Sequence, residues 1–530
     1  MFEPASALMS CPKRVQAPRR FRGALPSAAL ALATAALGSC AVGPDYHTPQ
    51  VRVPDHYAAV AAGPSSGATS AADLASWWRA LGDPELDSLI ERAVKANPDV
   101  LIALDRLQGA RTYEAGLVGT ILPAADASGA YGRGTGSDLT RGRSMEPLTS
   151  SDTAQGLNSI RAVGGFDAFW EIDVFGKLRR EMQQAHYNAQ AAADARNAVL
   201  VSVIADVARA YVDLRGLQMR DSVLRAAVDV LQQSLRIVTL RYQRGITNEL
   251  DVTLAARELA TFRAQLAPVE AQIKYGEYTI ATLLGQYPED LLAELAPAQM
   301  IPSVPATAAT GMPVDLLRRR PDIQQAEREL ASATAGIGVA TADLFPQFIV
   351  TGAIGFQRGV VGTADVGKHI WSVGPGAVWP LLDFGQLDAQ VQVATLQTRA
   401  RLTSYKALIQ TAVQQVDSDV DSFAAQQASL KSLGDALVAS QRAVTLANQR
   451  YDRGLTDFLN VVDAEREEYA IQEQYVDAQA SVDDQFVLLY RDLGGGWQDF
   501  QKLPGIVRPL PAVLAIFRDT LARSDPLHDP

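Results

Sequence analysis

The feature that most constrains this chain is an internal duplication. Residues 241–247 read RYQRGIT, and residues 450–456, 209 positions later, read RYDRGLT. Nearer the N-terminus the spacing becomes 223, since Pro98-Asp99 is matched by Pro321-Asp322. We predict two copies of one long unit, a first repeat at 81–287 and a second at 313–496, joined by an equatorial connection at 288–312.

Each copy contains a very long helical pattern. Apolar residues recur at spacings of three and four over six heptads, from Gly176 to Arg244 and again up to Tyr451, which is typical of coiled-coil packing. A helix of about 68 residues spans roughly 100 Å. Each pattern stops at an Arg-Gly pair, and Gly allows the left-handed turn that ends a helix. We therefore predict helical hairpins at 176–285 and 385–493.

The segments before these hairpins read as β-structure preceded by short helices. Alternating apolar and polar residues predict a hairpin at about 124–174 and another at about 347–382, with strands of about ten residues. Four strands cannot close a membrane barrel, because the smallest natural barrels have eight. Strands from several copies must then pair in a closed ring. An ordinary amphipathic hairpin on a soluble domain is the alternative reading.

The N-terminus reads as a lipoprotein signal. A basic stretch is followed by a short apolar run, Ala24 to Leu37, which is too short to span a bilayer as a mature helix. The run ends in Leu-Gly-Ser before Cys40, so we predict a signal peptide at 1–39 and lipidation of Cys40. Ala41, in place of an acidic residue, favours sorting to the outer membrane. Residues 40–80 are predicted to be a lipid-anchored extended linker.

Composition excludes several classes of function. The net charge of −11 argues against nucleic-acid binding. With two cysteines and five histidines, the chain shows no spacing typical of a metal site. No arrangement of nucleophile, acid and base appears, so we predict neither an enzyme nor a catalytic cofactor.

Several short motifs, in order, resemble the TolC-like outer-membrane factors, and among them the NodT-type efflux lipoproteins. They lie between Cys40 and Trp497: GPDY, WW, DPEL, NPD, RRPDI, LDFG and the YxxG of the second tip. Each motif is short, but their order and spacing together are specific to this family.

The resemblance implies a mainly α fold with a membrane β segment. Three copies would form a homotrimer whose twelve strands, four per chain, close a barrel in the outer membrane, while the hairpins form a periplasmic α-barrel. The subunit would passively conduct small molecules delivered by an inner-membrane pump through a periplasmic adaptor protein. Cys40 would carry a diacylglycerol and an N-acyl chain, and the outer-membrane lipid would be its partner. Residues 497–530 would be a C-terminal equatorial segment or tail.

The resemblance also places a gate and adaptor contacts at the hairpin tips. The gate would include Asp251, Tyr451, Asn460 and Asp463; we hypothesise that Asp251 latches to Tyr451, or to a neighbouring arginine. Asn460 stands where the family often has a second aspartate, which predicts a less charged constriction. The residues expected to contact the adaptor are Arg244, Gly245, Thr247, Arg453, Gly454 and Thr456.

Two other functions are compatible with parts of this pattern. The same fold serves type I protein secretion, although the lipidation signal and the GPDY motif favour small-molecule efflux. A periplasmic coiled-coil lipoprotein without a pore is the second alternative, and the β segments argue against it.

Overall fold

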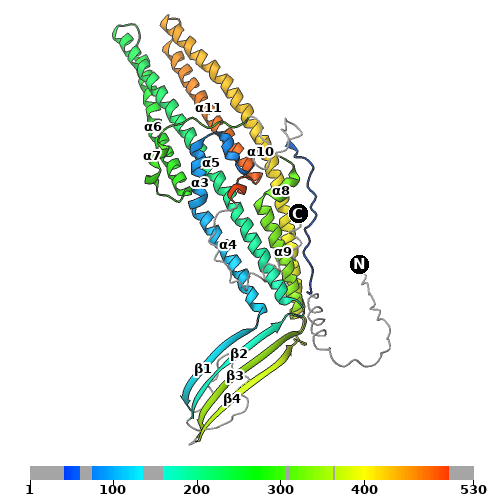
Figure 1. Cartoon of the computed structure of the whole chain (residues 1–530). Helices are drawn as coiled ribbons and strands as arrows, with labels where there is room; N and C mark the ends of the chain where they lie inside the picture. The colour runs from blue at the N-terminus through cyan, green and yellow to red at the C-terminus, as the bar shows by residue number, and fades with distance from the viewer. Residues whose placement is uncertain (1–40, 60–73, 135–158, 306–310, 362–363, 501–530) are drawn as a thin grey trace.

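The computed structural model describes residues 41–59, 74–134, 159–305, 311–361 and 364–500. The predicted signal peptide, Cys40 and residues 501–530 lie outside the described residues. The described chain is elongated, with a four-stranded sheet at one end and two helical hairpin tips at the other (Figure 1).

The two repeats fold into matching series of elements, which confirms the predicted fold class. The first comprises α4 (Pro98–Leu117), β1 (Ala124–Gly134), β2 (Ser159–Ile172), α5 (Lys177–Gln243) and α6 (Glu249–Leu283). The second comprises α9 (Pro321–Ala342), β3 (Gln347–Val361), β4 (Ala364–Val378), α10 (Gln386–Asp452) and α11 (Phe458–Asp492). The long helices α5 and α10 both have 67 residues, and α6 and α11 both have 35.

The strands form one antiparallel sheet in the order β1-β2-β3-β4. Strand β4 begins at Ala364, because its pairing with β3 continues up to Val361 opposite Ala364. Strands β1 and β4 are the edges, so each has one side on which no described strand pairs with it. Unpaired strand edges are ready to pair with another chain.

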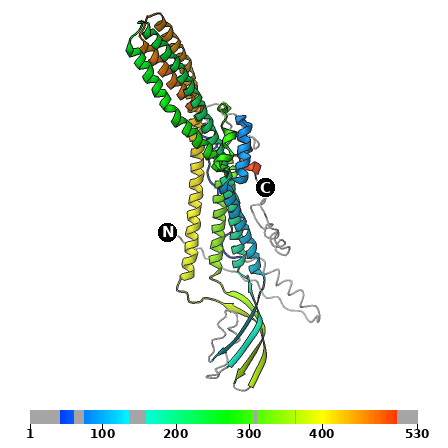
Figure 2. The same cartoon turned by 90° about the vertical axis from the view of Figure 1, so that its left-hand side faces the viewer.

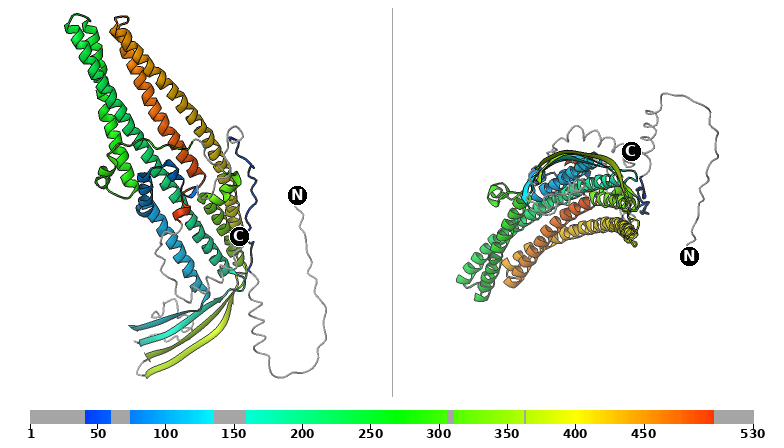
Figure 3. Two further views of the ribbon diagram at one scale, coloured as in Figure 1. Left: turned by 45° about the horizontal axis from the view of Figure 1, so that its top comes forward. Right: turned by 90° about the horizontal axis from the view of Figure 1, so that it is seen from below.

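The long helices make one curved layer, visible end-on in Figure 3. In the half nearer the sheet, contacts order the helices α4-α5-α9-α10. In the half nearer the tips, the order becomes α6-α5-α11-α10. Helices α5 and α10 run through both halves, as Figure 2 shows for α10. Among the described residues, no helix has both the length and the apolar character needed to cross a membrane.

A belt of shorter elements packs against the middle of this layer. It contains η2 (Trp77–Leu81), α3 (Pro84–Ala96), η6 (Pro288–Asp290), α7 (Leu292–Leu295), η7 (Pro313–Asp315), α8 (Leu316–Arg319) and η8 (Gln498–Phe500). Helix α3, which the sequence analysis did not predict, begins at a proline, and Asp83 caps it by accepting from the backbone N–H groups of Glu85 and Leu86. The largest apolar core lies here, around the buried rings of Trp77 and Trp78.

The segment predicted as a linker, residues 40–80, proved to be partly core. Tyr57, Leu74, Trp77 and Trp78 are each at most 2% exposed, so the final part of the segment folds into the belt. Residues 41–59 are extended, as predicted, but they are docked along the helices. We call residues 41–59 the strap. It is held by side chains distant in sequence, which composition could not reveal.

The belt is fastened to α5 by a buried arginine. The Arg215 guanidinium is fully buried and contacts Glu85 Oε2 at 2.9 Å, the Pro297 carbonyl at 2.9 Å and Gln218 Oε1 at 2.7 Å. Beside it, the Tyr211 hydroxyl donates to Asp83. One charged side chain thus joins α3 and the equatorial connection to the long helix.

We predict that Arg215→Met costs about 3–5 kcal/mol of unfolding free energy, because it leaves the Glu85 carboxylate poorly paired in the belt. Arg225→Met is the matched control. Arg225 is about half exposed and pairs with Asp221 and Glu270 on the surface, so its loss costs at most about 1 kcal/mol. Denaturant titration followed by circular dichroism measures both. Equal losses for the two variants contradict the role given to Arg215.

Candidate functional site

The two hairpin tips are built in the same way. Gly245 and Gly454 have φ of 71° and 69°, the left-handed conformation that glycine adopts at little cost. At each tip the third residue after the helix bonds back across the turn: Ile246 N–H donates to the Arg241 carbonyl, and Leu455 N–H to the Arg450 carbonyl. Asn248 then caps α6 through a bond from Asp251 N–H.

The predicted latch residues Asp251 and Tyr451 lie in one cluster between the two hairpins. Tyr451 is 9% exposed and packs on Phe458, at 5.3 Å between ring centroids. Burial raises the pKa of Tyr451, the nearby Arg241 opposes that rise, and the charge of Asp251 adds to it. Asp251 itself accepts a hydrogen bond from the Thr247 hydroxyl. The structure therefore brings Asp251 close to Tyr451 and gives no direct hydrogen bond between them.

Arg241 completes this cluster. Its guanidinium carbon lies 4.4 Å from the centre of the Tyr451 ring, a cation–π contact, and its Nη1 lies 3.5 Å from Asp452 Oδ1. The sequence analysis offered a neighbouring arginine only as an alternative partner of Asp251 and did not single out Arg241. Arg241 lies three residues before Arg244 in the repeated RYxRG motif. This position is the sequence signal by which Arg241 could have been identified.

The other predicted tip residues lie outside this cluster. Asn460 donates to the Thr456 hydroxyl at 2.8 Å. Asp463 is exposed and pairs with Arg466 at 3.5 Å. Arg244, Gly245, Arg453 and Gly454 are exposed at the ends of the hairpins. These residues are thus displayed on the surface, where another molecule could contact them.

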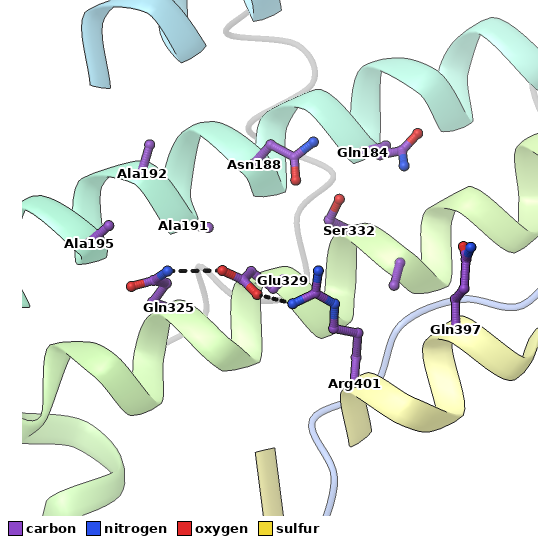
Figure 4. A pocket seen from close by; sticks show the side chains of 11 residues that line it. Gln184, Asn188, Ala191, Ala192, Ala195, Gln325, Glu329, Ser332, Gln397 and Arg401 are labelled. Atoms are coloured by element: carbon purple, nitrogen blue, oxygen red, sulfur yellow. Dashed lines mark hydrogen bonds and ion pairs between the residues drawn. The ribbon is translucent and has the colours of Figure 1, made fainter. Parts of the chain in front are cut away.

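A polar groove opens on the helical layer. It has a volume of about 700 Å³ and lies between α5, α9 and α10. Glu329 accepts from Gln325 at 2.9 Å and from Arg401 at 2.6 Å (Figure 4). Glu327 contacts the strap and lies two positions before Glu329. The two side chains therefore point about 200° apart around α9. On α9 the strap and the groove thus contact opposite sides of the helix, and the groove has a polar, amide-rich lining.

A pair of carboxyl groups lies between α10 and α11 near the belt. Gln485 Nε2 donates to Asp419 Oδ1 at 3.0 Å, and Arg491 Nε donates to Asp492 Oδ1 at 2.9 Å. Burial, together with the charge of Asp492, raises the pKa of Asp419 to about 7. Sequence reasoning missed this pair, because the two residues are 73 positions apart and neither belongs to a motif.

The N-terminal end of the strap lies beside the junction of sheet and helices. Val42 N–H donates to the Phe175 carbonyl at 3.0 Å, and Arg180 Nη2 contacts the Gly43 carbonyl and Asp45 Oδ1. Gly43 lies so close to Gly338 that a Cβ on it would come within 2.4 Å of the Gly338 Cα. Cys40 lies outside the described residues, but the chain that follows it is fixed at this junction.

No group of three or more His, Cys, Asp or Glu in the described part of the chain could hold a metal ion. The conspicuous features are instead a curved helical layer with a polar face, an edge-exposed sheet and two tight tips.

The family model for outer membrane efflux proteins matches residues 89–286 and 312–495. The chain belongs to the outer membrane efflux protein family. The two matched segments fall on the two repeats. The chain is 27% identical to nodulation protein T of Rhizobium leguminosarum bv. trifolii, over 88% of its own length and 96% of the relative's. It is 29% identical to the pyoverdine export outer membrane protein OpmQ of Pseudomonas aeruginosa, over 87% and 95%.

Solved structures agree with this assignment. The outer-membrane channel OprN is 34% identical, with a TM-score of 0.76 over 87% of this chain and 100% of that one. The Campylobacter jejuni CmeC channel, at 18% identity and a TM-score of 0.75, shares the fold. The chain is therefore an outer-membrane efflux channel subunit, and the resemblance inferred from its motifs is confirmed.

The Asp419–Asp492 pair predicts a pH-dependent stability. Because the pKa of Asp419 is raised on folding, its contribution is fully present below about pH 4 and is lost as the pH rises through about 7. Asp419→Asn keeps the polar contacts without the charge. We expect it to raise the melting temperature at pH 8 and to change it little at pH 4. The exposed Asp421→Asn is the control, and an equal shift at both pH values contradicts the prediction.

Proposed function

We propose that three copies of this chain form the exit duct of a tripartite efflux system for small molecules. The observation that carries this proposal is the sheet, in which β1 and β4 each have a free edge. A four-stranded sheet buries all its backbone groups in lipid only when its edges are paired, so copies must join edge to edge. With three copies, twelve strands close the ring.

The polar face of the helical layer supports a water-filled conduit. If the strap and the belt lie on the outside of the ring, then the opposite face, with Gln184, Asn188, Glu329 and Arg401, lines the inside. An amide-rich lining offers hydrogen bonds to water and to varied solutes, which suits passive conduction without catalysis. The driving energy would come from an inner-membrane pump.

A direct test is to compare heated and unheated protein on a denaturing gel and to record currents in planar bilayers. A trimer that dissociates only on heating and conducts ions supports the duct. A heat-insensitive monomer that never conducts contradicts it and favours the coiled-coil lipoprotein without a pore.

We further propose that the tips close the duct and receive the adaptor. The cluster of Arg241, Thr247, Asp251 and Tyr451 would hold the two hairpins together in the closed state. Exposed Arg244, Arg453 and Asp463 are available to an adaptor that competes for these helix ends. Adaptor binding would then separate the hairpins by replacing contacts between them.

We predict that Asp251→Ala increases single-channel conductance in bilayers, because it removes the carboxylate beside Thr247 and Tyr451. Arg241→Ala should act in the same direction, since it removes the cation–π contact and the pair with Asp452. Glu249→Ala, an exposed acidic residue two positions from Asp251, is the matched control and should conduct like the parent. Unchanged conductance in Asp251→Ala refutes the latch.

We propose that Cys40 carries the lipid anchor. The strap holds the following residues at the junction of sheet and helices, which would place the acyl chains beside the sheet. We predict that Cys40→Ser abolishes labelling by radioactive palmitate while the purified protein still assembles and conducts, since the strap contacts remain. Undiminished labelling of Cys40→Ser contradicts the assignment.

A further inference from the structure

A buried arginine without a carboxylate partner lies between α5 and the belt. Arg196, on α5, is 7% exposed. Its Nη2 donates to Asn197 Oδ1 at 2.8 Å and to the Phe500 carbonyl at 3.4 Å. Its Nε is buried and has no hydrogen-bond partner within the described part of the chain. The described residues thus give this cation two acceptors, and both of them are neutral oxygens.

Arg196 is an exception among the buried arginines of this chain. The described residues include three other buried arginines, and each of them pairs with a carboxylate. These pairs are Arg180 with Asp45 at 2.8 Å, Arg215 with Glu85 at 2.9 Å, and Arg320 with Asp322 at 2.7 Å. A buried charge is unfavourable unless an opposite charge or several hydrogen bonds offset it. The fold meets this requirement at three positions and leaves it unmet at Arg196.

A second guanidinium lies near Arg196. Burial lowers the pKa of Arg196, and the positive charge of Arg111 on α4 lowers it further. Helices α4 and α5 run side by side below the belt (Figure 1). Arg111 is exposed and forms no ion pair with any residue that the structure describes. Two positive charges therefore lie close together without an anion between them.

The nearest acidic residues along the same two helices are engaged elsewhere. Glu114, three positions after Arg111, contacts His186 Nδ1 at 2.7 Å. Asp194, two positions before Arg196, lies about 200° around α5 and pairs with Arg328 of α9 at 4.0 Å. Neither carboxylate is thus available to the two arginines.

The belt holds the Arg196 guanidinium in place. The ring of Phe500, whose carbonyl accepts from Arg196, stacks on Trp78 at 6.0 Å between centroids. Trp78 is itself 2% exposed within the main apolar core. On the other side, Asn197 is 8% exposed and accepts from the same nitrogen. These contacts keep Arg196 from turning toward a more distant carboxylate.

We propose that Arg196 and Arg111 form a binding site for an oxyanion, a phosphate or carboxylate group, beside the belt. A guanidinium presents a fork of N–H donors that matches two oxygens of such an anion. Nη1 of Arg196 has no acceptor among the described residues and, unlike Nε, is not fully buried. It is therefore open to the ligand, and the exposed Arg111 would close over the anion from the solvent side.

A bound oxyanion would offset both the burial of the Arg196 charge and its repulsion from Arg111. It would also connect α4 to α5 next to the last described turn of the belt. Because the two arginines come together only in the folded chain, binding should stabilise the fold by mass action. Both arginines belong to one chain, so the proposal does not depend on how copies assemble.

Equilibrium dialysis with radioactive inorganic phosphate tests the site on the detergent-solubilised full-length protein. At constant ionic strength we expect saturable uptake of about one phosphate per chain, with a rise in melting temperature over the same concentrations. Arg111→Gln changes an exposed side chain and should weaken binding about tenfold or more, because a charged contact is lost. Arg196→Lys keeps the charge without the fork and should weaken binding as well.

Arg236→Gln is the matched control. Arg236 is an exposed arginine on α5 that lies 40 positions from Arg196, or about 60 Å along the helix. The control removes the same charge from the protein and should bind phosphate like the parent. If uptake does not saturate, or if Arg111→Gln binds as tightly as Arg236→Gln, the phosphate is held non-specifically and the proposal is wrong.

The oxyanion has two candidate sources, free phosphate and a carboxylate of residues 501–530, and a further variant separates them. That segment contains three acidic residues, Asp519, Asp525 and Asp529. Uptake by the parent protein identifies a free anion as the ligand. Uptake only when all three are changed to Asn identifies a carboxylate of the chain itself. If neither protein takes up phosphate, the two arginines form no oxyanion site.

Discussion

The structure depends on the requirement that backbone hydrogen bonds be satisfied in lipid. One chain supplies four strands, and both edge strands, β1 and β4, have a free side. No arrangement of one chain alone can pair these edges. The helical layer has the same property, since α4 and α6 form one edge and α10 the other. The proposed ring of identical copies would pair the edges of the sheet and the edges of the helical layer at the same time.

The duplication makes such a ring easy to specify. The first and second repeats have the same helix lengths, since α5 and α10 both have 67 residues and α6 and α11 both have 35. A heterologous contact between copies closes only when its rotation divides a full turn. In the proposed ring, the curvature already visible within one chain would continue from copy to copy.

At several equivalent positions, one repeat has a charged side chain and the other has an uncharged one. Asp251 and Asn460 are equivalent positions, so the cluster around Tyr451 has a carboxylate that its counterpart lacks. Likewise the Lys177–Asp343 pair, at 2.6 Å, has the uncharged Gln386 and Thr120 at the equivalent positions. Ion pairs and buried carboxyl groups such as Asp419–Asp492 are sensitive to pH and to competing partners. These contacts, which can respond to pH or to a competing partner, all lie within one chain.

Much of this fold could be predicted from the sequence, because its signals are local. The Arg-Gly stops set the ends of α5 and α10, and prolines set the starts of α4 and α9. The docking of the strap could not be predicted, since it depends on Gly43 meeting Gly338 and on Arg180, both far away in the chain. Helix α3 was missed although Asp83-Pro84 is a start signal, because the motif was read for resemblance alone.

The candidate site was predicted less completely. Asp251 and Tyr451 were found because they lie beside the repeated motif, and the structure places them close together. Arg241 was not singled out, because its cation–π contact depends on how two helices cross. Its partner Tyr451 lies 210 residues further along the sequence. The Asp419–Asp492 pair depends on packing between α10 and α11 in the same way. Contacts of this kind leave no local pattern in the amino-acid sequence from which they could be predicted.

We propose that identical copies close one continuous ring of strands and helices. Electron cryo-microscopy of the detergent-solubilised full-length protein tests it most directly. We expect a threefold particle with twelve strands at one end and an unbroken helical wall beyond. A particle with another number of copies, or one in which β1 and β4 remain unpaired, would contradict it.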